Sequence, residues 1–321
     1  MEVLGLYSMD LDMFLKHADN HDHLVTATEL NFVCNEFHAD KGHSRQPWKG
    51  SVYSCNNLLL GETKYGYYMI NPATREMKNV PKTPTWRPTA VRPILMSLCG
   101  FGFDYSTNEY KVVNGQIYND YIVFSIYRLK TDVWRRIECH AYKYGNGFQG
   151  IFLNGAIHWV AEKVSVEPPQ VILTFLLAEE EVGEIQLPPI TTCSPITLGV
   201  FRDCLCITFG NYIDQLSEEF WVMKEYRVSE SWTKMRFSMP YRVLQGFGFS
   251  TKSHEVMLCD NSFVMYDSQK ESYKKLQIRD TPAVAYCLGV YVEGLFPLID
   301  HARDDESDVT PDEAYMKQIM F

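Results

Sequence analysis

The sequence lacks the segments that would direct the chain into a membrane or out of the cell. No basic stretch leading into an apolar core follows Met1, so no signal peptide is predicted. The most apolar stretch, residues 283–299, is short for a membrane span and is interrupted by Glu293 and Pro297. We therefore expect a protein of the cytoplasm, the nucleus or both, with no membrane partner.

The sequence is also poor in clustered basic charge and in paired cysteines. Its 30 Lys and Arg residues stand against 40 Asp and Glu residues, a net charge of −10, and form no basic patch of the kind that binds nucleic acid. Nine cysteines without a secretion signal indicate reduced thiols. Cys204 and Cys206 lack a second pair at zinc-ligand spacing, so they are predicted to be small core residues.

The motifs of several enzyme classes are absent from the sequence. No G-x-S-x-G elbow and no P-loop occurs, and the glycines at 100 and 102 lack the third glycine of a dinucleotide-binding turn. Two acidic runs, at residues 179–181 and 304–306, are typical of turns or solvated faces rather than of an acid and base paired in a cleft. We therefore expect no enzyme activity and no catalytic residue.

Histidines supply the remaining candidates for a ligand site. His17, His21 and His23 are the densest group, and the first two could bind zinc from one face of a helix. The Asp and Asn residues around them favour a solvated loop instead. His158 precedes Trp159 in an apolar run typical of a buried strand, so a structural histidine is predicted there. We expect no metal and no cofactor.

What the sequence has is strand-forming residues. It holds 20 Tyr, 18 Phe and 6 Trp, and no long window keeps the 3.6-residue apolar period of a helix. A unit of apolar strand, polar turn and second strand recurs along the chain at intervals of about 42 to 56 residues, the length of a propeller blade. Its anchor residues are Met69, Ser125, Phe175, Met223 and Met265. The predicted fold class is all-β, a β-propeller-like domain of repeated antiparallel blades.

Local patterns support the same fold. Residues 100–103 and 246–249 both read Gly-Phe-Gly-Phe before a polar turn, and residues 152–160 form a predicted hairpin with a glycine turn. Closing a propeller by pairing the chain ends would remove exposed strand edges. Residues 3–9 are therefore predicted to lie near residues 285–292.

Three segments are predicted along the chain. Residues 1–49 contain a first strand and an irregular segment, with a large loop over residues 17–50. Residues 50–296 form the propeller-like domain. Residues 297–321 carry seven acids and two bases, a net charge of −5, and are predicted to be a disordered tail, with an acidic partner site as the alternative.

Five motifs occur in order over roughly residues 50–295. They are NPATR at 71–75; GFGFD at 100–104 with YKVV at 110–113; Y-x-L-x-x-x-x-W at 127–134; NGxxHW at 154–159; and W-V-M-K-E-Y-x-V-x-E-S-W-x-K at 221–234. Together they resemble the plant F-box-associated domain family, which includes F-box/kelch-like and S-locus F-box-like proteins.

The resemblance implies a binding role without chemistry. Such domains are substrate-recognition modules of Skp–cullin–F-box ubiquitin ligase receptors, in which the F-box binds the Skp adaptor and the propeller-like part selects the target protein. The implied partners are a target protein for ubiquitination and, only with an F-box upstream, the Skp adaptor. No protein-binding residue is assigned, but loops at one end of the propeller and exposed aromatics are the expected contacts.

The sequence departs from the family at two points. The helical F-box near the start is missing, so the chain is expected to be a truncated receptor. Asn57 also stands where the family has the glycine of a CNGL turn. Two alternatives therefore stay open: a standalone interaction or decoy module without ligase coupling, and an enzyme built on a propeller.

Overall fold

The structure is a computed structural model in which defined parts of the chain are described. These are residues 6–10, 24–33, 48–63, 66–84, 97–118, 121–140, 142–145, 149–164, 170–189, 196–209, 217–238, 249–250, 254–259, 262–267, 270–279, 289–298 and 317–320. The chain divides into two compact units. Unit 1 holds Met1–Lys82 and Lys274–Phe321, and unit 2 holds Thr83–Tyr273.

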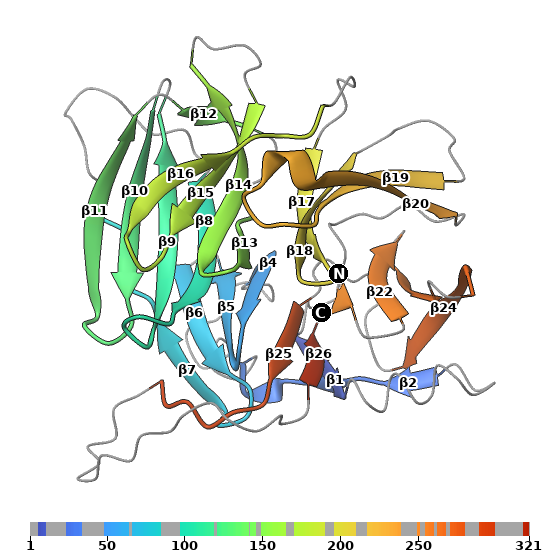
Figure 1. The fold of residues 1–321 in the computed structure, drawn as a ribbon. Coiled ribbons are helices and arrows are strands. Elements are labelled where there is room, and N and C mark those ends of the chain that lie inside the picture. Colours follow the sequence, from blue (N-terminus) through green and yellow to red (C-terminus); the bar gives the residue numbers. More distant parts are fainter. Residues whose placement is uncertain are drawn as a thin grey trace. The chain divides into compact units, whose positions relative to one another are not determined.

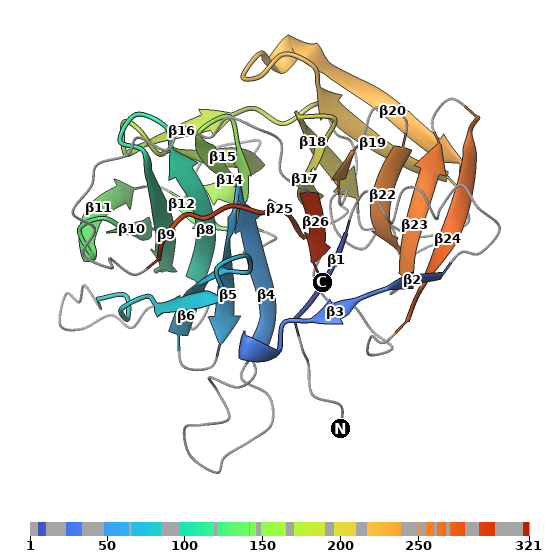
Figure 2. The same ribbon diagram turned by 90° about the horizontal axis from the view of Figure 1, so that it is seen from below.

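Unit 1 contains two four-stranded antiparallel sheets (Figure 2). The first has the order β4-β5-β6-β7, from β4 (Trp48–Cys55), β5 (Leu58–Thr63), β6 (Gly66–Asn71) and β7 (Glu76–Asn79). The second has the order β25-β26-β1-β3, from β1 (Tyr7–Asp10), β3 (Thr28–Glu29), β25 (Gly289–Val292) and β26 (Lys317–Met320). A short strand, β2 (Leu24–Thr26), pairs in parallel with β24 (Ser272–Arg279).

The chain ends meet in one sheet, in which β1 and β25 come from the two segments predicted to lie near each other. Ile319 of β26 pairs with Met9 on one side and with Val290 on the other, so β26 lies between β1 and β25. This strand falls within the segment predicted to be a disordered tail. It is ordered there because both neighbouring strands offer it backbone partners. Strands β2, β3 and the first residues of β4 likewise lie inside the predicted loop of residues 17–50.

Unit 2 repeats the antiparallel sheet (Figure 1). Its first sheet is β11-β10-β9-β8, from β8 (Ser97–Asp104), β9 (Glu109–Ile117), β10 (Tyr121–Arg128) and β11 (Val133–His140). The second is β12-β14-β15-β16 with β13 also paired to β14, from β12 (Tyr142–Tyr144), β13 (Ile151–Leu153), β14 (Ala156–Lys163), β15 (Gln170–Leu176) and β16 (Glu181–Ile185).

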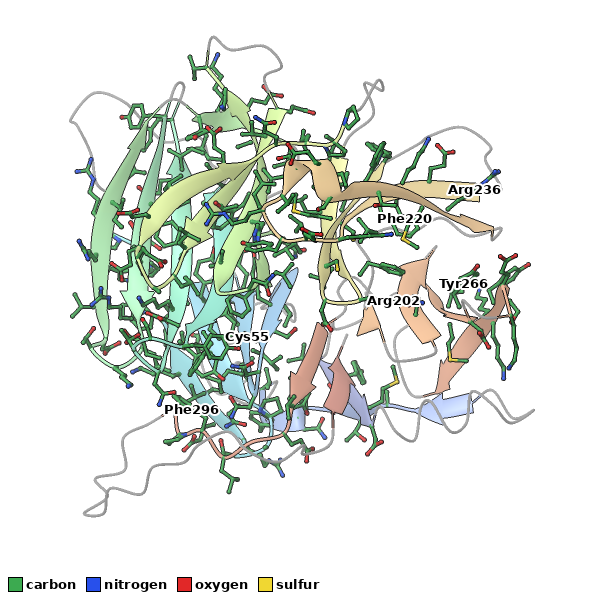
Figure 3. All side chains as sticks on the ribbon, viewed as in Figure 1. Cys55, Arg202, Phe220, Arg236, Tyr266 and Phe296 are labelled. Atoms are coloured by element: carbon green, nitrogen blue, oxygen red, sulfur yellow. The ribbon has the colours of Figure 1, made fainter. Side chains whose placement is uncertain are left out.

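The rest of unit 2 follows the same plan. The third sheet is β17-β18-β19-β20, from β17 (Ile196–Phe201), β18 (Cys204–Phe209), β19 (Ser217–Met223) and β20 (Trp232–Ser238), with the short 3-10 helix η1 (Ser229–Ser231) before β20. Strands β21 (Phe249–Ser250), β22 (His254–Cys259) and β23 (Ser262–Asp267) pair in order. Phe220 and Tyr266, labelled in Figure 3, belong to one apolar cluster of this region.

The predicted fold class is confirmed. The described strands form repeated antiparallel sheets of the propeller-blade type, and the five anchor residues fall on five strands of different sheets. These strands are β6, β10, β15, β19 and β23. The repeat can be recognised in the sequence because each sheet has to bury an apolar strand.

The main core of unit 2 lies between its first two sheets. Phe124 of β10 packs against Trp159 and Phe175, with ring centroids 5.6 and 5.5 Å apart. Glycines in β8 permit this approach, because a Cβ at Gly100 would lie 2.4 Å from Ile157 Cγ2 and one at Gly102 would lie 2.4 Å from Phe152 Cδ2. The Gly-Phe-Gly-Phe motif therefore places its glycines against the next sheet and its phenylalanines on the opposite face.

Candidate protein-binding surface

A buried lysine links the first two sheets of unit 2. Lys111 of β9 places its Nζ 2.8 Å from Asp104 Oδ2, 3.0 Å from Glu180 Oε1, and 2.8 Å from the backbone oxygen of Leu177, to which it donates. Glu180 and Leu177 belong to the β15–β16 turn. A buried ammonium group is stable only when oxygen atoms replace its water, and this geometry supplies three of them.

Glu180 collects two further cations. Arg128 donates to Oε1 at 2.5 and 2.9 Å, and Arg135 donates to Oε2 at 2.7 Å. Burial alone would raise the pKa of Glu180, but the hydrogen bonds from Lys111 and Arg128 outweigh it and hold the pKa below its ordinary value. The Asp104 pKa is lowered in the same way by Lys111, Ser106 and Thr107 against the effect of burial.

The acidic run at 179–181 therefore differs in part from the sequence prediction. Glu179 and Glu181 are exposed, as expected of a turn, but Glu180 is buried. Its backbone takes the left-handed conformation at φ 55°, which turns the side chain away from its two neighbours. The prediction of a solvated face was wrong for Glu180, because its cationic partners are 45 to 69 residues away in sequence.

Three hairpin turns meet through these contacts, and we name them together the hairpin face. They are the turns of residues 104–109, 128–133 and 177–181. Lys130 ties the first two turns by donating from Nζ to the Thr107 oxygen at 2.8 Å, while Glu180 ties in the third. The hairpin face exposes two apolar side chains, Tyr105 at 66% and Val133 at 57%. Tyr105 also packs edge-on against Phe103.

These exposed side chains stand on a backbone that is already fixed. Asn108 and Asp132 hold left-handed conformations at φ 52° and 56°, and Tyr127 fixes the second turn with a 2.5 Å hydrogen bond from its hydroxyl to Asp132 Oδ1. Exposed aromatic and apolar groups on preorganised turns are typical of protein interfaces, where they fill pockets at low entropic cost. The sequence indicated loops and exposed aromatics, but not which ones.

His158 joins the second and third sheets of unit 2. Its Nδ1 donates to the Ile151 oxygen at 2.9 Å, and its Nε2 accepts from the Tyr226 hydroxyl at 2.8 Å. Burial lowers the pKa of His158 to about 4, and the charge of Arg227 adds to the effect. Its neighbour Trp159 donates from Nε1 to the Cys99 oxygen at 3.1 Å. Both residues thus occupy buried, fully bonded positions, the arrangement expected of a structural pair.

The remaining candidates are the two cysteines, the histidine group and the second acidic run. Cys206 is buried in an apolar cluster against which Cys204 packs, and burial raises the pKa of the Cys206 thiol well above its ordinary value. His17, His21 and His23 and the acidic run at 304–306 lie outside the described residues. In the described parts of the chain, no group of three His, Cys, Asp or Glu residues is placed to hold a metal ion. None of the described helices has the length and apolar character needed to cross a membrane.

The NPATR segment of unit 1 acts as a clamp on the segment that follows β25 in the same unit. Asn71 donates from Nδ2 to the oxygens of Gly294 at 3.0 Å and Phe296 at 2.8 Å (Phe296 is labelled in Figure 3). Its Oδ1 accepts from the backbone nitrogens of Ala73 and Thr74, which closes the β6–β7 turn. One buried side chain therefore shapes its own turn and holds the chain that follows β25.

The motifs that the structure explains are those of one family. A family model described as the F-box associated beta propeller domain matches residues 1–307. The chain belongs to the F-box associated domain family. Within this F-box associated domain, Asn71 of the NPATR motif holds the segment after β25. The glycines of the GFGFD motif let the next sheet approach β8, and the NGxxHW motif supplies the contacts of His158 and Trp159.

Curated relatives of this F-box associated domain are plant F-box proteins. The chain is 26% identical over 269 residues to the F-box protein CPR1 of Arabidopsis thaliana, covering 72% of this chain and 64% of that protein. It is 29% identical over 193 residues to the F-box/kelch-repeat protein At3g23880 of the same plant, covering 57% of this chain and 51% of that protein. The chain thus spans between half and two thirds of the length of these relatives.

The similarity to solved structures is weaker than the similarity to these relatives. The oligogalacturonate lyase of Vibrio parahaemolyticus aligns at 9% identity with a TM-score of 0.43, over 78% of this chain and 68% of that protein. A subtype N10 neuraminidase-like protein of A/little yellow-shouldered bat/Guatemala/060/2010 aligns at 10% identity with a TM-score of 0.41, over 84% of this chain and 91% of that protein. At these values the likeness carries no information on function.

Proposed function

We propose that this chain recognises the target protein of a Skp–cullin–F-box ubiquitin ligase. Membership in the F-box associated domain family supports the proposal, and the related Arabidopsis proteins are F-box proteins by name. In this role the chain performs no reaction and needs no cofactor. It holds the target in the cytoplasm or nucleus while an F-box binds the Skp adaptor.

The observation that carries the proposal is the hairpin face. Tyr105 and Val133 are exposed apolar side chains on turns that buried ion pairs and left-handed residues hold in place. A target that covers both side chains gains apolar burial without having to order the turns. The hairpin face is therefore the surface that we assign to the target protein.

Ubiquitin transfer in a reconstituted ligase tests the ligase role. The full chain is fused behind an F-box, assembled with the Skp adaptor, cullin and conjugating enzyme, and supplied with proteins captured from a plant-cell extract. Captured proteins should be ubiquitinated by the fusion and left unmodified by the chain without the added F-box. Captured proteins that stay unmodified although the fusion binds the Skp adaptor would show that the ligase role is wrong.

A paired substitution tests the hairpin face itself. Tyr105→Ala combined with Val133→Ser should weaken target capture at least about tenfold, because aromatic anchors carry a large share of interface energy. Tyr273→Ala, which removes another exposed tyrosine, is the matched control and should leave capture unchanged. Equal capture by the wild type and the paired variant would remove the hairpin face from the proposal.

A further inference from the structure

A row of three small or polar residues crosses the second sheet of unit 2. In the strand register His158 of β14 lies opposite Thr174 of β15, and Thr174 lies opposite Gly183 of β16. The adjacent row, Val160, Ile172 and Ile185, belongs to the apolar cluster shared with β17 and β18. The polar row therefore lies beside that cluster, where the turn after β19 reaches across to His158 through Tyr226.

Two polar groups of this region border a small volume beside Gly183 that is too tight for a Cβ. The Thr174 hydroxyl oxygen lies 2.9 Å, and Arg227 Nη2 lies 3.6 Å, from the point where a side chain on Gly183 would begin. The Thr174 hydroxyl is buried and has no hydrogen-bond partner in the part of the chain that the structure describes. A buried hydroxyl left without a partner is costly, so its presence points to a group that comes from outside the chain.

Arg227 supplies the positive charge of this volume. It is exposed, and among the described residues no carboxylate pairs with its guanidinium group. Burial lowers the pKa of His158 and the Arg227 charge adds to this effect, whereas at Tyr226 burial raises the pKa and the same charge opposes it. The acid on the same face of β16 is Glu181, which is exposed and two residues before Gly183.

The backbone of Arg227 is strained. Its φ of 65° is left-handed, a conformation that suits glycine and is unfavourable for arginine. The family block at 221–234 leaves position 227 open, so the motif does not require arginine there. Arg227 therefore combines a strained backbone with a charge that no described carboxylate neutralises.

We infer that Thr174, Gly183 and Arg227 form a binding site for an acidic side chain, carboxylate or phosphate, of a bound protein segment. The guanidinium group supplies two parallel donors to the anion, the Thr174 hydroxyl supplies a third, and Gly183 places no side chain between these donors. Val228, next in the chain, is also exposed and apolar, which favours an acidic residue with an apolar neighbour over a free ion. This inference rests on the proposed function, because the segment would belong to the target.

The test follows the Thr174 methyl group by NMR in the full chain with ¹³C-methyl-labelled threonine. The probes are inorganic phosphate, the peptide acetyl-Leu-Glu-Leu-amide and the same peptide with phosphoserine in place of glutamate. A saturable shift of the Thr174 signal is expected, and the arm that binds more tightly identifies carboxylate or phosphate. A signal that does not move with any probe, or moves without saturation, would overturn the inference.

Matched variants assign the contacts. Arg227→Gly should weaken probe binding about tenfold or more by removing a charged donor, and its thermal midpoint should not fall because glycine suits the left-handed backbone. Arg227→Lys should retain part of the affinity, and Thr174→Val should lower it with unchanged folding. Arg236→Gly, on β20 as labelled in Figure 3, removes another exposed arginine and should have no effect. Undiminished binding by Arg227→Gly and Thr174→Val would contradict the assignment.

The outcome for this site is separable from that for the proposed function. Loss of probe binding in Arg227→Gly with intact ubiquitin transfer by other contacts would still support an anion site. A chain that binds no probe, yet captures and delivers targets through the hairpin face, would overturn the anion site and leave the proposed function standing.

Discussion

The ammonium group of Lys111 lies 3.0 Å from the Glu180 carboxylate, and the two side chains are only 1% and 4% exposed. Because Lys111 also contacts Asp104, a single cation sits between two buried carboxylates from different sheets. Breaking such a cluster costs more than its formation contributes, since the groups that remain are buried and uncompensated. Lys111 therefore helps to hold the turn of residues 177–181 against the turn of residues 104–109.

Lys111→Met should lower the free energy of unfolding by about 3 kcal/mol or more, the range found when one partner of a buried ion pair is removed. Arg128 and Arg135 still neutralise Glu180, so Asp104 is the residue left with hydroxyl and backbone donors alone. Adding Asp104→Asn should recover part of the loss. Urea unfolding measures both.

An exposed ion pair serves as the control for this prediction. Lys234 lies 2.5 Å from Glu219, and both side chains are about half exposed. Lys234→Met should change the free energy of unfolding by less than about 1 kcal/mol, because solvent already stabilises each charge. Equal effects of the two substitutions would show that the Lys111 cluster is solvated.

The strand repeat could be predicted from the sequence because it is local. A strand, a polar turn and a returning strand are written within some twenty residues, and the alternation of apolar residues follows from burial of one face. Cys206 and Trp159 were assigned to the core by the same reasoning, and both are buried.

Contacts between distant residues could not be predicted in the same way. Glu180 reads as the middle of an acidic turn until Lys111, Arg128 and Arg135 are brought to it. The strand β26 could not be predicted from its acidic segment, because it forms by pairing with the edges of β1 and β25. Arg227 and Thr174 are 53 positions apart in the sequence, so nothing local marks their shared volume. The missing signal is in each case a partner, not a residue type.

Gly102→Ala should destabilise unit 2 by about 1–3 kcal/mol, the usual cost of overpacking a well-packed core. The new methyl group would lie 2.4 Å from Phe152 Cδ2 and 2.7 Å from Leu177 Cδ1, so both side chains must move. Thermal unfolding measures the loss. Combining Gly102→Ala with Phe152→Leu should restore part of the stability, and the absence of any recovery would locate the clash elsewhere.

The stability of the protein should depend on His158 between pH 6.5 and pH 4. The folded-state pKa of His158, about 4, lies below the ordinary value of 6.5. Between these two pH values the unfolded chain binds a proton at His158 and the folded chain does not. The stabilisation is complete above pH 6.5 and is lost as the pH falls towards 4, with a maximum of about 3 kcal/mol. The measurement is the free energy of unfolding at several pH values.

His158→Gln is the comparison that isolates this effect. Glutamine does not titrate, so the difference in unfolding free energy between wild type and variant should shrink as the pH falls from 6.5 to 4. The carboxylates Asp104 and Glu180, whose pKa values are also lowered, act in both proteins and cancel in the difference. A difference that stays constant over this range would show that His158 is accessible to protons in the folded protein.

Asn71→Ala should loosen the chain after β25 while leaving the β4–β7 sheet folded. The substitution removes the two donors to Gly294 and Phe296 and the acceptor for the turn, which should lower the free energy of unfolding by about 1–3 kcal/mol. Amide hydrogen exchange should accelerate at Leu298, whose nitrogen donates to Glu76 Oε2 at 3.0 Å across the clamp.

Asn79→Ala, which removes an exposed side chain with one 3.3 Å hydrogen bond from Nδ2 to the Tyr68 hydroxyl, should leave that exchange unchanged. Because the two asparagines lie at opposite ends of one hairpin, faster exchange in both variants would trace the effect to the hairpin as a whole. Faster exchange in Asn71→Ala alone assigns it to the clamp.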